Sequence, residues 1–169
     1  DTWIAGADIE MLQTLQTATE AEAMVRNGHR AVLKIVDSPK PVVAAVHGAA
    51  YGGGFQLMLA ADIRFMAANT KLSIMEINWG LVPDMGGMVL LRDLVRDDIG
   101  RELTYTGRVF DGNEAQRIGL ATRLCADPYA DALALAREIA ARPPKAMRAA
   151  KRLLDLAAQT PFVLGVVGY

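Results

Sequence analysis

Two acidic residues, Glu76 and Asp84, lie eight positions apart in surroundings that could support acid–base chemistry. Glu76 stands inside an apolar run, where burial would raise the pKa of its carboxyl group and suit it to act as a general base or acid. Asp84 follows Pro83 and precedes a pair of glycines. Each acid also has a structural interpretation: Glu76 could be an ion-paired residue at an edge, and Asp84 could be a helix N-cap. The spacing alone leaves open whether the two carboxyl groups meet in one pocket.

Three consecutive glycines, Gly52, Gly53 and Gly54, form a second candidate feature. They stand between a buried apolar run and a helix start, where free backbone N–H groups and the positive end of the helix dipole can bind a negatively charged oxygen. Such donors suit an oxyanion that develops during a reaction. The alternative is a tight turn that allows close packing of helix and strand.

A third feature is the short segment that contains Ala5, Ala7 and Asp8. Asp8 could cap the helix that begins there. The functional interpretation is that the Ala7 N–H acts as a second donor beside Gly53. Two N–H groups from separate loops that meet at one oxygen would form an oxyanion hole.

The elements that must position these residues are predicted to be alternating strands and helices. Apolar runs over 42–46 and 63–67 predict buried strands, and the glycine turn and a helix over 54–60 separate them. This order is typical of a parallel α/β unit. Further helices are expected over 18–36, 86–95, 98–106, 112–118, 128–141 and 145–158, with a short strand over 122–125. We therefore expect one α/β domain with a helical C-terminal part.

Composition excludes several classes of protein. Eighteen Lys and Arg residues against nineteen Asp and Glu residues give a net charge of −1, so no global field favours nucleic acid or an anionic membrane. The basic residues Lys145, Arg148, Lys151 and Arg152 are interpreted as a solvated helix face, with a phosphate contact as the alternative.

Cysteine and histidine are scarce. With Cys125 as the single cysteine and only His29 and His47, neither a disulfide framework nor a metal site is expected. The charge-free run over 42–61 nominally reaches the length of a membrane span, but its glycines, His47 and Gln56 argue against that interpretation. We expect no membrane span and a cytoplasmic protein.

Motifs along most of the chain occur in a characteristic order. They cover 5–8, 40–48, 52–54, 61–64, 75–77, 80–84 and 106–108, followed by residue 115 and 119–120. Together they resemble the crotonase, or enoyl-CoA hydratase/isomerase, superfamily. The resemblance implies an α/β fold with a crotonase-like ββα spiral core, here over 1–125, and a C-terminal helical region over 126–169. Because members of the superfamily begin several strands earlier and end with more helix, both flanks of this chain are expected to be short.

The resemblance also implies a ligand and an assembly. Members bind acyl-coenzyme A thioesters, with coenzyme A as part of the substrate and no separate cofactor, and they associate as homotrimers or dimers of trimers. Ala7 and Gly53 would supply the oxyanion N–H groups. The substrate-binding backbone around them would comprise Ala5, Asp8, Gly52 and Gly54.

Departures from the superfamily pattern indicate the reaction. Hydratases carry a second glutamate where this chain has Gln56, which can position groups but cannot exchange a proton. Asp84 matches the catalytic aspartate of the dienoyl-CoA isomerase branch, and Glu76 is retained. The resemblance therefore favours migration of a double bond in an unsaturated acyl-CoA. The alternatives are 2-enoyl-CoA hydration and a non-catalytic acyl-CoA-binding homologue.

Overall fold

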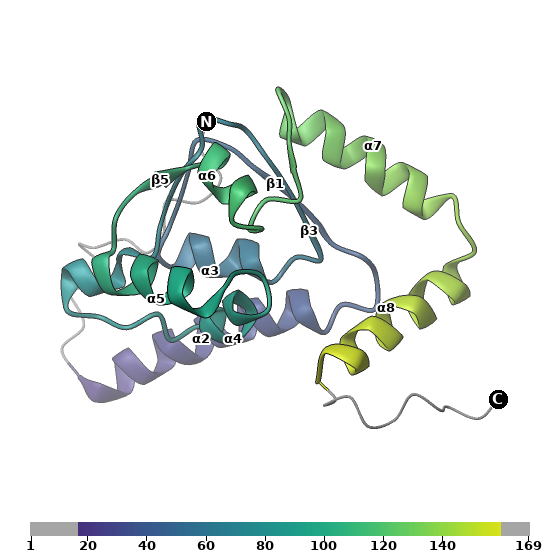
Figure 1. Ribbon diagram of the computed structural model, residues 1–169. Helices are drawn as coiled ribbons and strands as arrows, with labels where there is room; N and C mark the ends of the chain where they lie inside the picture. The colour runs from purple at the N-terminus through teal and green to yellow at the C-terminus, as the bar shows by residue number, and fades with distance from the viewer. Residues whose placement is uncertain (1–16, 160–169) are drawn as a thin grey trace.

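The computed structural model describes residues 17–159, which form strands in two small sheets surrounded by helices (Figure 1). The helices are α2 (Ala18–Val36), α3 (Gly53–Leu59), the 3-10 helix η1 (Met75–Trp79), α4 (Gly87–Arg92), α5 (Asp97–Thr106), α6 (Gly112–Arg117), α7 (Pro128–Ala140) and α8 (Pro144–Gln159). The strands are β1 (Val43–Val46), β2 (Ala49–Tyr51), β3 (Ile63–Met66), β4 (Lys71–Ser73), β5 (Phe110–Asp111) and β6 (Arg123–Leu124).

The first four strands alternate between the two sheets along the chain. One sheet has the order β1-β3-β6 and is parallel throughout, and the other has the order β2-β4-β5, in which β4 pairs in parallel with β2 and antiparallel with β5. From β1 to β4 the chain therefore places one strand in each sheet before it forms helix and begins the next turn. This alternation produces the spiral of ββα units that the resemblance implies.

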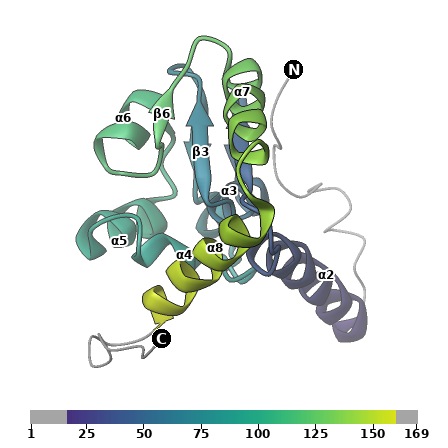
Figure 2. The same ribbon diagram turned by 90° about the vertical axis from the view of Figure 1, so that its right-hand side faces the viewer.

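Strand β1 shows why the sequence runs predicted as strands, 42–46 and 63–67, are almost continuously apolar. Ala44 and Val46 face the large core, while Val43 and Ala45 pack on the other side against a smaller cluster with Phe65. Helix α7 covers that second face, as Figure 2 shows beside β3. Because both faces of the sheet are covered, neither requires polar residues.

Most predicted elements are confirmed, with differences at their ends. Helix α2 has the predicted bounds, because Thr17 and Glu20 form a capping box at its start. The helix predicted over 86–95 is shorter, since α4 ends at Arg92. Strands β2, β4 and β5 and the 3-10 helix η1 were not predicted. These strands have only two or three residues, too few for a hydrophobic period to show.

The charge-free run over 42–61 is divided among β1, β2 and α3, which agrees with the rejection of a membrane span. Among the helices of residues 17–159, none combines the length and apolar character needed to cross a bilayer.

Candidate active site

The first turn of α3 is the centre of the candidate site. Gly52 precedes the helix with φ = +49°, a conformation that side chains rarely adopt, and its N–H donates to the Ser73 carbonyl at 3.0 Å. Gly53 occupies the first helical position, where the backbone N–H has no acceptor within the helix. The carbonyl of Ser73, the last residue of β4, thus fixes the glycine turn. The start of α3 therefore lies beside the residues that follow β4.

Glu76, in η1, lies directly against this turn. A Cβ atom added to Gly52 would lie 3.5 Å from Glu76 Oε1 and 3.8 Å from Oε2. Oε1 accepts a 2.8 Å hydrogen bond from Gln56 Nε2, while Oε2 is buried and has no hydrogen-bond partner among the described residues. The ion-paired interpretation of Glu76 therefore finds no support in residues 17–159.

Burial raises the pKa of Glu76 above its ordinary value. Hydrogen bonds from its own backbone and from Gln56 oppose this shift, and the negative charge of Asp84 adds to it. A carboxyl group with a raised pKa and a free oxygen can accept a proton from a bound molecule, as predicted from its apolar sequence context.

Gln56 connects Glu76 to the loop that carries Asp84. Its side chain is 1% exposed, and its Oε1 accepts hydrogen bonds from the backbone N–H groups of Met85 at 3.0 Å and Gly87 at 3.1 Å. These two N–H donors and the accepting Glu76 carboxylate fix the orientation of the Gln56 amide. In the reverse orientation the amide NH₂ group would face the two N–H donors and the amide oxygen would face the carboxylate. What Gln56 positions in this structure is Glu76 and the backbone after Asp84.

Asp84 is exposed and stands in the turn before α4. The N-cap of α4 is Gly86, with φ = +91° and no side-chain capping bond, so the capping interpretation of Asp84 is wrong. Its negative charge contributes to the raised pKa of Glu76, and whether the two carboxyl groups share one pocket stays a prediction. The segment between η1 and α4 thus returns the chain to the start of α3.

The structure leaves some predicted site residues untested. Ala5, Ala7 and Asp8 lie outside the described residues, so the second oxyanion donor stays a prediction. Gly54 is buried inside α3, behind Gly53. Within the described part of the chain, no group of three or more His, Cys, Asp and Glu residues could hold a metal ion.

One residue of this site, Met85, was not predicted from the sequence. Its side chain lies against the first turn of α3, since a Cβ atom on Gly53 would be 3.1 Å from Met85 Sδ. Only its position next to Asp84 could have indicated this, because a single methionine has no spacing pattern to recognise.

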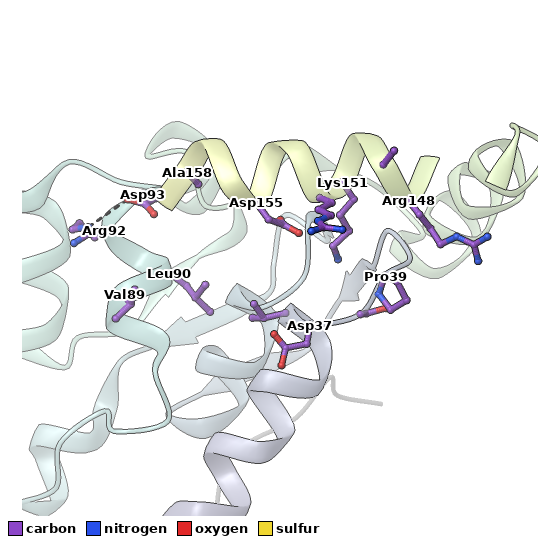
Figure 3. A pocket seen from close by; sticks show the side chains of 14 residues that line it. Asp37, Pro39, Val89, Leu90, Arg92, Asp93, Arg148, Lys151, Asp155 and Ala158 are labelled. Atoms are coloured by element: carbon purple, nitrogen blue, oxygen red, sulfur yellow. Dashed lines mark hydrogen bonds and ion pairs between the residues drawn. The ribbon is translucent and has the colours of Figure 1, made fainter. Parts of the chain in front are cut away.

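A cavity of about 950 Å³ lies elsewhere (Figure 3). It is bounded by the end of α2, by α4 and by α8, and Asp37, Arg148 and Asp155 are among the charged residues around it. Neither Glu76 nor Asp84 lines this cavity, so its size does not mark the acid–base site.

One residue of the predicted basic face is not solvated. Lys151 is 7% exposed, and its Nζ lies 2.8 Å from Asp62 Oδ2 and donates to the Lys40 carbonyl at 3.2 Å. Lys145, Arg148 and Arg152 are exposed, as the prediction requires. Lys151 differs because it points inward to the strands.

Known proteins resemble this chain in both sequence and fold. The family model described as enoyl-CoA hydratase/isomerase matches residues 2–163. Human mitochondrial methylglutaconyl-CoA hydratase is 32% identical over 168 residues, which are 96% of this chain and 49% of that protein. The crystal structure of an enoyl-CoA hydratase from Bacillus anthracis superposes with a TM-score of 0.88 at 30% identity, over 93% of this chain and 61% of that one.

A Thermobifida fusca relative has been solved in complex with CoA and again with acetoacetyl-CoA. Both structures give a TM-score of 0.87 at 32% identity, over 95% of this chain and 66% and 68% of theirs. The chain spans about half the length of the human relative and about two thirds of the Thermobifida chains. The match over 2–163 and the shared α/β spiral show that the chain belongs to the enoyl-CoA hydratase/isomerase family.

Proposed function

We propose that the chain binds acyl-CoA thioesters and moves a double bond along an unsaturated acyl chain by a proton shuttle. The observation that carries this proposal is the Glu76 carboxyl group, held by Gln56 against the glycine turn with one buried oxygen free. The CoA complexes of the Thermobifida relative support the choice of ligand.

The proposed reaction begins at the thioester carbonyl, whose oxygen accepts hydrogen bonds from the Gly53 and Ala7 N–H groups. Glu76 removes a proton from the acyl chain of a 3,5-dienoyl-CoA, and the electron pair delocalises toward the carbonyl oxygen as a dienolate. The two N–H groups stabilise that negative charge. Asp84 relays a proton from solvent to a carbon farther along the chain, and Glu76 releases its proton to solvent, so the product is an isomer of the substrate.

Gln56 has a positioning role in this mechanism. Its amide cannot exchange a proton, but its bonds to Glu76 Oε1 and to the Met85 and Gly87 N–H groups maintain the acid and the following loop in one arrangement. Addition of water across the double bond by two carboxyl groups is less well supported, because this chain has one carboxyl group where hydratases have a pair.

The test compares the wild-type chain with Glu76→Gln and Asp84→Asn on 3,5-dienoyl-CoA and on 2-enoyl-CoA. Removal of a general base should lower isomerisation by about 10²- to 10⁴-fold in Glu76→Gln. Undiminished isomerisation by Glu76→Gln would refute the mechanism.

Two other results of the same test would favour the two alternative functions. Faster hydration than isomerisation by the wild type favours the 2-enoyl-CoA hydratase function, which the names of the human and Bacillus relatives suggest. Binding of acyl-CoA without turnover, insensitive to both substitutions, favours a non-catalytic acyl-CoA-binding protein.

A further inference from the structure

Met85 occupies a slot between two helices beside the candidate site. Its side chain lies between Gly28 of α2 and Gly53 of α3, and a Cβ atom on Gly28 would be 2.9 Å from Met85 Cγ. A Cβ atom on Gly53 would be 3.1 Å from Met85 Sδ. The thioether therefore fills space that both helices leave open by lacking a side chain.

The backbone of Met85 is held at the same place. Its N–H donates to Gln56 Oε1 at 3.0 Å, and Gln56 in turn donates to Glu76. Met85 follows Asp84 directly, so one short segment supplies an acid and an apolar side chain to the region in front of α3.

Packing of the core does not account for Met85. The residue is half-buried, and it is absent from the large apolar cluster of the described residues. Met88, one turn further on, packs against that cluster instead. The Met85 side chain thus belongs to the partly open region around Gly53.

We propose that Met85 is a specificity-determining residue that limits the site to acyl thioesters unbranched next to the carbonyl carbon. The inference rests on the proposed function, in which the carbonyl oxygen accepts a hydrogen bond from the Gly53 N–H. A carbonyl oxygen about 3 Å from that nitrogen brings the adjacent acyl carbon within a few ångströms of Gly53. Met85 Sδ lies beside the same glycine, 3.1 Å from the position that a Cβ atom on Gly53 would take. A methyl branch on that carbon and the thioether therefore compete for one space.

The test measures binding rather than turnover, so it does not depend on the reaction assigned to the site. Isothermal titration calorimetry of the wild-type chain and Met85→Ala with butanoyl-CoA and 2-methylpropanoyl-CoA gives the ratio of the two Kd values. The preference for the linear thioester should fall by about tenfold in Met85→Ala, since discrimination of one methyl group is typically of that size. Met88→Ala is the matched control and should keep the wild-type ratio.

A second variant probes the same slot from α2. Gly28→Ala places a methyl group against Met85 Cγ and should increase the preference for the linear thioester by at least threefold. In the Met85→Ala background the same substitution should have no effect, because the side chain that it displaces is gone. Since alanine favours helix over glycine, this variant is expected to fold.

The outcomes distinguish this inference from the proposed function. Wild-type protein that binds neither thioester contradicts acyl-CoA binding itself, and the specificity inference with it. Wild-type protein that binds butanoyl-CoA, with a ratio unchanged in Met85→Ala or a Gly28→Ala effect equal in both backgrounds, overturns only the role of Met85.

Discussion

Glu76 is partly buried, and the two oxygens of its carboxyl group have different surroundings. One oxygen has a 2.8 Å hydrogen bond from Gln56, and the other is buried without a partner among the described residues. Loss of water around the second oxygen destabilises the charged form, which is why burial raises the pKa of Glu76. The same unpaired oxygen is available to a substrate proton, so the chemical use of this residue has a cost in stability.

That cost predicts a pH dependence of folding. In the folded state the pKa of Glu76 is raised above its ordinary value of 4.5, so the unfolded chain loses this proton at lower pH than the folded chain. The folded state is therefore destabilised as the pH rises from the ordinary value through the raised one. Glu76→Gln removes this contribution, so urea unfolding should show the variant gaining stability relative to wild type between pH 4 and pH 7.

Glu22→Gln is the control for that measurement. Glu22 is exposed on α2 and pairs with Arg26 at the surface. Its variant should follow the wild-type pH dependence closely. A Glu76→Gln variant that does the same would contradict the destabilising role of the buried carboxylate.

Gln56→Glu tests the connection between the two sides of the site. One new carboxylate oxygen would still accept from the Met85 and Gly87 N–H groups, and the other would face Glu76 Oε1 where Nε2 donates now. Two adjacent carboxyl groups retain a shared proton, which raises the higher pKa of the pair.

The pH profile of isomerisation should then move to higher pH, and the rate of hydration relative to isomerisation should rise. Steady-state assays from pH 5 to 9 measure both quantities. Gln116→Glu adds the same charge at an exposed position of α6 and should leave the profile unchanged. A profile that does not move in Gln56→Glu would argue against this coupling.

At the scale of elements, α8 is held to the sheet by one inward-facing lysine. Lys151 reaches Asp62, at the start of β3, and the carbonyl of Lys40, before β1. Asp62 also accepts from the Val42 N–H at 2.7 Å, so the same carboxylate connects both strands to the helix. Few of the apolar side chains of α8 are covered by the described chain, which gives this polar contact a large share of its attachment.

Lys151→Met should therefore destabilise the chain by about 2 kcal/mol, less than for a fully buried pair because Asp62 remains partly exposed. Chemical denaturation followed by circular dichroism measures the change. Arg142→Ala removes an exposed ion pair with Glu138 and is expected to cost about 0.5 kcal/mol or less. Equal effects of the two substitutions would show that Lys151 does not anchor α8.

At the scale of the whole molecule, α8 carries an uncovered apolar face. Leu153, Leu154 and Leu156 are 62%, 72% and 49% exposed in the single chain. Contiguous apolar surface of this kind commonly marks an association surface. We propose that the chain assembles as a homotrimer or a pair of trimers, as its resemblance to the superfamily implied. The division into a spiral core over 1–125 and a helical region over 126–169 also stays a prediction.

Sedimentation equilibrium tests this assembly directly. The expected mass is three or six times that of one chain, and Leu154→Asp should shift the equilibrium toward smaller species. Ala134→Asp introduces the same charge at an exposed position of α7 and should leave the mass unchanged. A monomeric wild-type chain at micromolar concentration would contradict the proposal.

Patterns of neighbouring residues are enough to recognise the family and most of the helices. The capping box of Thr17 and Glu20 and the Asp127 cap before Pro128 are contained in a few neighbouring residues, so they can be recognised without the fold. The apolar runs at β1 and β3 can likewise be recognised as strands from the sequence, and the ordered motifs identify the family.

The assembly of the candidate site depends on contacts between segments that are distant in the sequence. Gln56, Glu76 and Met85 come together because β2 and β4 pair in parallel and bring the glycine turn beside the chain that leaves β4. Those strands are three residues long, and their pairing joins segments about twenty residues apart. No local pattern contains that pairing. The free oxygen of Glu76 and the occupied amide of Gln56 follow from it, since burial and hydrogen-bond partners belong to the packed molecule and not to the residue types.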